Sequence, residues 1–189
     1  GTQDFGVFYR NGSIGTNLAI ANFNSNYAYT TSLRRYTLPA GWSADDIATI
    51  IWDTDVKTDV WALFKNGSTL TDAAQADLTT DIAFAATVNT FSLPANFNIS
   101  NAIGAVMDTN VTLGQSGMFF RNGSIAIDAG ETAPFAFTTR ITKFTLPAGF
   151  NTLDAIGVDI DNGSNQLIMF FRNGSAVVDT SQVDLSTDV

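Results

Sequence analysis

Short apolar runs alternate with polar turns along the whole chain, and none of the runs has the periodicity of a long helix. The runs are rich in Thr, Val, Ile, Phe and Tyr, which favour strands, whereas Gly, Asn, Asp and Pro gather between them. The stretch Ser43–Ile51 has room for at most one short helical turn. The pattern therefore predicts an all-β chain built from short strands.

One hairpin signal occurs four times. The triplet Asn-Gly-Ser follows an apolar run and one basic residue at Asn11, Asn66, Asn122 and Asn173, so successive copies are 55, 56 and 51 residues apart. Asn-Gly between strand-like runs favours a two-residue type I′ turn, in which both central residues have positive φ. We therefore expect four β-hairpins at regular spacing.

A second motif, Leu-Pro-Ala, is interleaved with the hairpins. Its three copies contain Pro39, Pro94 and Pro147, and each is followed two residues later by an aromatic residue and then by a further apolar run. The residue before proline is restricted to extended conformations, so each motif ends one strand and precedes the next. In the second unit, Ala83–Leu93 is expected to form the strand before proline.

The two motifs divide the chain into four units of about 55 residues and about four strands each. Their approximate bounds are 1–42, 43–97, 98–150 and 151–189, within a single repeat domain spanning 1–189. Only ten residues precede Asn11 and only 16 follow Asn173. We therefore expect the first unit to lack its post-proline strand and the last unit to lack its pre-proline strand.

Four small units of four strands fit a small β-propeller. A weaker period of 111 residues, which separates Asn11 from Asn122, supports a different arrangement. In that alternative the chain forms two tandem β-sandwich domains, 1–97 and 98–189. We take the propeller as the leading fold and keep the sandwiches as the alternative.

Parts of the units resemble known propeller repeats. The segments Asp154–Val158 and Met169–Gly174, with Asp179 after them, resemble a hemopexin-type blade, which has an Asp-Ala strand, a Phe-Phe-Arg-Gly type of hairpin and a following Asp. The segment Asp53–Phe64 resembles an FG-GAP/VCBS-type blade. Both resemblances imply a β-propeller, and the second implies a calcium-binding loop, as in some members of that family.

Composition excludes much chemistry. The chain has no His and no Cys, which removes imidazole bases, thiolate nucleophiles and zinc or iron sites that need these ligands. Nine Lys and Arg against 18 Asp and Glu give a net charge of −9, which disfavours nucleic-acid binding. The acidic residues recur with the repeat and form no unique pair of the kind a glycosidase uses. We therefore expect a non-catalytic protein.

Asp-rich turns are the candidate metal sites. Alternate carboxylates in a tight loop offer hard oxygen ligands for Ca²⁺, the one cofactor that the sequence suggests. The candidates are Asp53, Asp55, Asp59, Asp159 and Asp161. The alternative is ordinary turn chemistry, because Asp and Asn side chains bond their own backbone in turns.

Basic and aromatic residues at repeated positions are candidate ligand contacts. Arg10, Lys65, Arg121 and Arg172 precede the four Asn-Gly pairs and form either an anion-binding ring or solvated cations beside turns. The three tryptophans offer platforms for sugar stacking, although aromatics at equivalent repeat positions are more often core residues. These tryptophans are Trp42, Trp52 and Trp61.

Seven sequons of the form Asn-x-Ser/Thr make glycosylation an open prediction. Their asparagines are Asn11, Asn66, Asn98, Asn110, Asn122, Asn162 and Asn173. Four of them coincide with the hairpin signal, which explains those four without a glycan. The low charge and the many Thr, Ser and Asn residues favour an extracellular or cell-surface location.

The incomplete terminal units suggest how the protein works. A sheet that lacks a strand exposes unpaired backbone groups that invite strand addition from a neighbour. The candidate assembly ends are Gly1, Phe5, Val7, Asp184, Leu185 and Val189. We therefore expect a structural or adhesive protein that self-assembles into a filament or surface layer as a homo-oligomer or polymer, without a membrane span. The two incomplete ends could equally close on each other within one chain. The alternative functions are a lectin-like, carbohydrate-binding propeller and a fragment of a longer repeat array.

Overall fold

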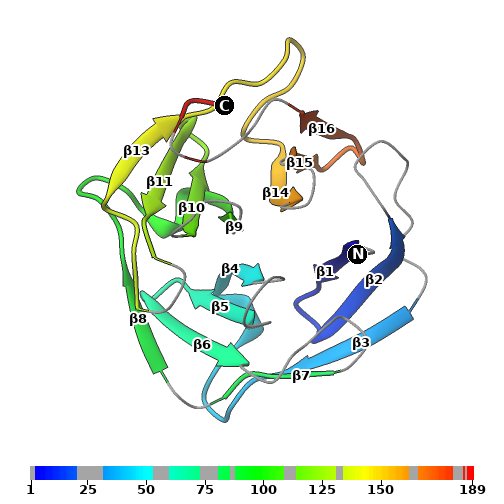
Figure 1. The fold of residues 1–189 in the computed structure, drawn as a ribbon. Coiled ribbons are helices and arrows are strands. Elements are labelled where there is room, and N and C mark those ends of the chain that lie inside the picture. Colours follow the sequence, from blue (N-terminus) through cyan, green and yellow to red (C-terminus); the bar gives the residue numbers. More distant parts are fainter. Residues whose placement is uncertain are drawn as a thin grey trace.

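The computed structural model describes residues 3–20, 32–52, 60–72, 81–85, 88–108, 114–130, 134–161, 166–180, 185 and 187–189. Apart from two 3-10 turns, η1 (Ala44–Asp46) and η2 (Ile99–Asn101), the elements of these ranges are strands. The strands form four sheets arranged in a ring (Figure 1). The prediction of an all-β, propeller-like fold is confirmed, and the sheets do not pair into two sandwiches.

The sheets are named blades A to D in chain order. From the centre outward, blade B contains β4 (Ile47–Trp52), β5 (Val60–Phe64), β6 (Ser68–Asp72) and β8 (Val88–Ser92). Blade C contains β9 (Ala102–Asp108), β10 (Gln115–Phe120), β11 (Ser124–Asp128) and β13 (Arg140–Lys143). Neighbours in both sets are antiparallel. Each of these blades has the four strands that the repeat predicts.

Blades A and D each have three such strands among the residues that the structure describes. Blade A contains β1 (Gln3–Phe8), β2 (Ser13–Ile20) and β3 (Ser32–Thr37). Blade D contains β14 (Ala155–Asp161), β15 (Gln166–Phe171) and β16 (Ala176–Asp179). Because β1 precedes an Asn-Gly hairpin as β5, β10 and β15 do, blade A has no described counterpart of the innermost strands β4, β9 and β14.

Two very short strands, β7 (Ile82–Ala83) and β12 (Phe135–Ala136), tie neighbouring blades together. The strand β7 pairs in parallel with β3 of blade A, and β12 pairs in parallel with β8 of blade B. Val189 is placed similarly beside β13 of blade C, where its N–H donates to the Lys143 carbonyl at 2.8 Å. Each of these segments comes from the unit after the blade it joins, so it links consecutive blades.

The expected single strand Ala83–Leu93 is therefore wrong in its bounds. Ala83 belongs to β7 on the preceding blade, and the outer strand of blade B, β8, begins only at Val88. The alternation of apolar and polar residues does not reveal this division, because both pieces are extended and partly apolar. The separation is a long-range effect of the partner strand that each piece meets.

The four hairpins also differ in detail from the predicted type I′ turn. In the first, the Gly12 N–H donates to the Tyr9 carbonyl and the Tyr9 N–H donates to the Ser13 carbonyl. Gly12 has φ +83°, whereas Asn11 is not among the described residues with positive φ. The central pair is thus Arg10 and Asn11, and the glycine follows it in the left-handed region, as in a type I turn with a bulge. The other three glycines have φ between 82° and 86°.

The hydrophobic core lies between consecutive blades. One cluster joins blades A and B and includes Ile14 and Phe64, a second joins B and C, and a third joins C and D and includes Phe119 and Phe171. No cluster among the described residues joins D to A. Trp61 is buried in the second cluster, and Trp42 and Trp52 pack against the first, which confirms that the tryptophans are core residues.

Candidate functional site

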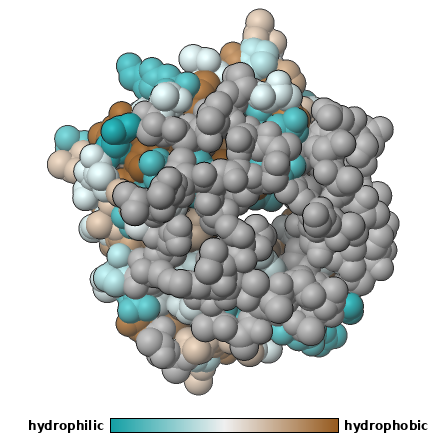
Figure 2. All heavy atoms as spheres, viewed as in Figure 1, coloured by the Kyte–Doolittle hydropathy of each residue, from teal (hydrophilic) through white to brown (hydrophobic). Residues whose placement is uncertain are grey.

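A cavity of about 1100 Å³ lies where blade A would hold an innermost strand. It is bordered by β1 with Phe8, by β4 with Ile50 and by β14 with Gly157. In Figure 2 an opening is visible near the middle of the ring. Because blades A and D share no described core cluster, this cavity takes the place of the packing found between the other blades.

The edge of β1 that faces this cavity has no strand partner among the described elements. β1 pairs only with β2, whereas β5, β10 and β15 each pair on both sides. The N–H of the basic residue after each of the three paired strands donates to a residue just before an inner strand, at 2.9–3.0 Å. These donors are Lys65, Arg121 and Arg172. The corresponding N–H of Arg10 has no such acceptor in the described part of the chain.

Backbone alternation defines which groups of β1 are free. The Tyr9 N–H donates to the Ser13 carbonyl in β2 at 2.9 Å, so the N–H groups of Gly6, Phe8 and Arg10 point the opposite way, toward the cavity. Unpaired backbone groups in a row are a template for strand addition. Within the described ranges, the site is therefore a strand position without a strand, beside a preformed edge.

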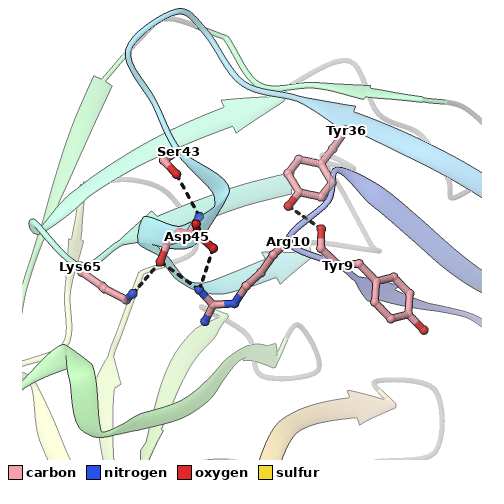
Figure 3. Close-up of polar contacts among 6 residues, drawn as sticks. All are labelled: Tyr9, Arg10, Tyr36, Ser43, Asp45 and Lys65. Atoms are coloured by element: carbon pink, nitrogen blue, oxygen red, sulfur yellow. Dashed lines mark hydrogen bonds and ion pairs between the residues drawn. The ribbon is translucent and has the colours of Figure 1, made fainter.

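The Tyr9 side chain is exposed where its counterparts in the other blades are buried. Its counterparts Phe64, Phe120 and Phe171 are at most 3% exposed, and each ring contacts the aromatic residue of the preceding Leu-Pro-Ala motif at centroid distances of 4.4, 4.7 and 4.8 Å. Tyr9 is 46% exposed. Figure 3 shows its ring directed away from the polar cluster around Asp45, while its carbonyl accepts a hydrogen bond from the Tyr36 hydroxyl.

The basic residues before Asn-Gly bind backbone carbonyls. The Arg10 guanidinium donates to the Asp45 carbonyl at 3.1 Å and lies 3.4 Å from its carboxylate, and the Lys65 ammonium donates to the same carbonyl (Figure 3). Arg121 donates to three carbonyls between Thr152 and Ala155. Arg10 and Arg121 thus each hold the turn before the inner strand of the next blade. Of the two alternatives that the sequence left open, an anion-binding ring and solvated cations beside turns, these contacts with backbone carbonyls favour cations beside turns.

Arg172 occupies the corresponding position in blade D, whose next blade in the ring is A. Its side chain is exposed, and no hydrogen bond or ion pair of its guanidinium is found within the described ranges. The turn that it would hold would precede an inner strand of blade A, and no such strand is found among the described residues. Within the described part of the chain, Arg172 therefore lacks the contact with the next blade that Arg10 and Arg121 make.

Inner strands contact each other around the ring at a fixed pair of positions. The Ala105 N–H of β9 donates to the Thr49 hydroxyl of β4 at 3.1 Å. One step further, Gly104 of β9 lies so close to Val158 of β14 that an added Cβ would be 3.0 Å from the Val158 side chain. Gly157 of β14 is the next member of this series, and an added Cβ there would meet nothing within 4 Å.

Asp159 brings a carboxyl group to the wall of this cavity. The equivalent residues of β4 and β9 are Ile51 and Val106, which are buried and apolar. The pKa of Asp159 is raised to about 7, mainly by burial. The N–H of Ile160, which donates to the carboxylate, lowers this pKa, and the neighbouring Asp161 carboxylate raises it. This carboxyl group is therefore largely protonated in mildly acidic solution.

The raised pKa of Asp159 leads to a prediction about stability. The folded chain holds a proton that the unfolded chain releases, since the pKa is about 7 when folded and about 3.8 when unfolded. The free energy of unfolding contributed by this group therefore falls as pH rises from about 4 to 7 and levels off above 7. We expect Asp159→Asn to raise the melting temperature at pH 8 more than at pH 5. A melting temperature that changes equally at both pH values would contradict this expectation.

The predicted metal site gains no support from the described residues. Asp53, Asp55 and Asp59 lie outside them. Asp159 and Asp161 are two positions apart on β14, but no group of three or more acidic side chains that could hold a metal ion is found within the described ranges. Calcium binding stays a prediction.

Five of the seven sequon asparagines fall in the described ranges, and all five are exposed. Each side-chain carbonyl accepts a hydrogen bond from the N–H two residues later, at 2.9–3.0 Å, which is ordinary turn chemistry. They are Asn11, Asn66, Asn98, Asn122 and Asn173. Asn110 and Asn162 lie outside the described residues. Glycosylation stays a prediction.

The candidate assembly ends divide into two groups. Phe5 and Val7 lie in β1, and Val7 lines the cavity. Leu185 is fully buried in the cluster between blades C and D, and Val189 hydrogen-bonds to β13. Gly1 and Asp184 lie outside the described residues. The N-terminal group is therefore at the vacant position, whereas the described C-terminal residues are engaged within the chain.

Sequence reasoning missed two residues of this site, Tyr9 and Gly157, and it gave Arg172 a different role. The signal for Tyr9 was present in the repeat. Tyr9 aligns with three phenylalanines, and each of these is preceded in the chain by a Leu-Pro-Ala motif and its aromatic residue. The first unit has no such motif before it among residues 1–10. The roles of Gly157 and Arg172 become visible only when the order of the blades is known, because that order places blade D next to blade A.

The fold and the site together define an all-β, four-bladed, propeller-like protein in which, among the described residues, no strand occupies the innermost position of blade A. No protein-family model and no curated protein matches the chain. Among solved structures, the chain is similar to PorZ, a surface component of the type-IX secretion system of Porphyromonas gingivalis, with 11% identity and a TM-score of 0.37. The similarity covers 96% of this chain and 31% of that one, so the chain spans less than a third of that protein. No helix in the described residues is long and apolar enough to span a membrane.

Proposed function

We propose that this chain is a non-catalytic structural or adhesive protein of the cell exterior that assembles into filaments or a surface layer by strand complementation at blade A. The open edge of β1 beside the cavity of about 1100 Å³ carries the proposal. Such an edge binds a further strand through backbone hydrogen bonds. The proposed partner is a second copy of the chain, and contacts between two different surfaces of successive copies extend into filaments when they do not close a ring.

The acidic residues support a structural role. The Asp72 carboxylate accepts a hydrogen bond from the Ala83 N–H at 2.8 Å, and the Asp128 carboxylate accepts one from the Ala136 N–H at 2.6 Å. These two carboxylates therefore hold the strands β7 and β12 that link consecutive blades. Together with the absence of His and Cys, this use of repeated carboxylates favours a scaffold over an enzyme.

The described tail residues limit how copies can join. Because Leu185 is buried and Val189 is hydrogen-bonded to β13 of its own chain, these residues are not free to enter a second copy. The proposal therefore places the acceptor at blade A and does not use these tail residues as the donor.

Sedimentation velocity over a wide concentration range, with electron microscopy of the same samples, tests the proposal. The variant Gly157→Trp places a large ring in the vacant position, and the free space around Gly157 lets the chain fold unchanged. We expect large species for the wild-type chain and a monomer for Gly157→Trp. A wild-type chain that stays monodisperse and monomeric at high concentration would overturn self-assembly.

A further inference from the structure

We propose that the segment accepted by blade A is a half-unit of the repeat itself, with the pattern of residues 94–108, reaching the site from a second polypeptide. This inference rests on the proposed function and specifies the chemistry of the partner. The half-unit contains a Leu-Pro-Ala aromatic residue, a short turn and an inner strand, which in residues 94–108 are Phe97, η2 and β9. Blades B, C and D each hold such a half-unit at the equivalent position.

The first requirement on the partner is an aromatic residue ahead of its strand. In the other blades this residue packs against the counterpart of Tyr9, and the contact leaves that counterpart at most 3% exposed. Tyr9 itself is 46% exposed. A partner aromatic at the position of Phe97 would cover the Tyr9 ring in the same way. The half-unit therefore fits this part of the site better than a bare strand does.

The second requirement is a turn with free carbonyl groups between the aromatic residue and the strand. Arg121 of blade C binds two carbonyls of the turn before β14, at 2.8 and 3.0 Å, and the carbonyl of Ala155, the first residue of β14, at 3.2 Å. Arg172 occupies the equivalent position in the next blade, D, and its side chain is exposed. Its guanidinium would bind the carbonyls of an incoming turn such as η2. An extended peptide without this turn would leave Arg172 in solvent.

The third requirement concerns the size of two consecutive strand residues. Ala105 of β9 and Val158 of β14 occupy equivalent positions. Each of them packs on the inner strand of the preceding blade. An incoming residue at this position would pack over Gly157, which has open space. The residue before it, equivalent to Gly104, would pack toward Ile50 of β4, which lines the same cavity.

The fourth requirement is an apolar residue next in the strand. Ile51 of β4 and Val106 of β9 are buried and belong to the clusters toward the following blade. For a strand in blade A the following blade is B, whose facing cluster contains Val60 and Ala62. A segment with Val106 at this position would bury an apolar side chain there. The otherwise similar segment 147–161 would bring Asp159 to the same place, so the two segments form a matched pair.

Binding of two synthetic peptides, 94–108 and 147–161, tests the inference by fluorescence anisotropy against the whole chain. We expect peptide 94–108 to bind the wild-type chain and to lose binding to Gly157→Trp, while Ala148→Trp, an equally large change on an exposed turn, leaves binding unchanged. Peptide 94–108 with Phe97→Ala should bind about tenfold more weakly because it lacks the ring over Tyr9. Arg172→Ala should weaken binding of the unmodified peptide.

Peptide 147–161 adds an independent test of the register. Its Asp159 carboxyl enters an apolar position, so we expect it to bind more weakly than 94–108 at pH 8 and the ratio of the two affinities to move toward one at pH 5. Peptide 147–161 also carries Asp154, where 94–108 has Asn101, so the same peptide with Asp159→Asn is the control that isolates the contribution of Asp159. Equal affinities at both pH values would overturn the register.

The outcomes separate this inference from the proposed function. If wild-type chains assemble and Gly157→Trp prevents assembly, but peptide 94–108 does not bind, the half-unit inference is wrong and strand complementation at blade A stands. If peptide 94–108 binds with the expected variant pattern and the chain is monomeric at all concentrations, self-assembly is wrong and the half-unit site stands. Peptide binding that Gly157→Trp leaves unchanged would overturn the half-unit site.

Discussion

Replacing Phe120 with Ala is expected to lower the free energy of unfolding by about 3–5 kcal/mol, which is the usual cost of removing a buried phenylalanine. Phe120 is 1% exposed and lies 4.7 Å, between ring centroids, from Phe97, so the substitution removes a ring from the cluster between blades B and C. Chemical denaturation monitored by circular dichroism measures the change.

Tyr9→Ala is the matched control, because Tyr9 occupies the same repeat position in blade A. The Tyr9 ring is half-exposed, and no aromatic partner of the kind found in the other blades is present among the described residues, so we expect a loss below about 1 kcal/mol. Similar losses for the two variants would mean that blade A is as well packed at this position as blade C. That result would remove the vacancy on which the proposed function depends.

Leu185→Ala should lower the free energy of unfolding by about 2–5 kcal/mol, although residue 185 lies far in sequence from the blade that it stabilises. Its side chain is fully buried, and an added Cβ on Gly117 of β10 would stand 2.7 Å from its methyl carbon. Its carbonyl also accepts a hydrogen bond from the buried Thr142 hydroxyl at 3.4 Å. The tail therefore fills a space in blade C that the strands leave open.

Thr187→Ala serves as the control for Leu185→Ala, since Thr187 is exposed in the same tail. We expect it to change stability by less than about 0.5 kcal/mol. If Leu185→Ala were equally mild, the tail would not be docked in solution, and Val189 would become available as a donor strand. Chemical denaturation of both variants under the same conditions distinguishes the two cases.

Much of the fold follows from the sequence because the repeat fixes its own register. The spacing of the Asn-Gly triplets locates the four hairpins, and the described part of blade A has three of the four strands of a complete unit. The three Leu-Pro-Ala motifs locate the turns before the inner strands of the other units. These signals are local, because turn residues act through their own backbone conformation and do not depend on distant contacts.

The features that the sequence does not reveal depend on contacts between distant segments. The pairing of β7 with β3 decides that Ile82 and Ala83 belong to the preceding blade, and no local propensity encodes that choice. The glycine that follows the two central residues of each hairpin, as a bulge, likewise depends on the pairing of the two strands. The raised pKa of Asp159 likewise depends on its burial in the folded chain, where β4 and β9 carry Ile51 and Val106.

Amide hydrogen exchange, followed by NMR, tests the vacant strand position most directly. The N–H groups of Gly6, Phe8 and Arg10 should exchange rapidly in the free chain, whereas those of Leu63, Phe119 and Phe170, which pair with inner strands, should be protected. Addition of peptide 94–108 should slow exchange at the first three and leave the others unchanged. Protection of Gly6, Phe8 and Arg10 in the free monomer, equal to that of their counterparts, would contradict the existence of an open edge in blade A.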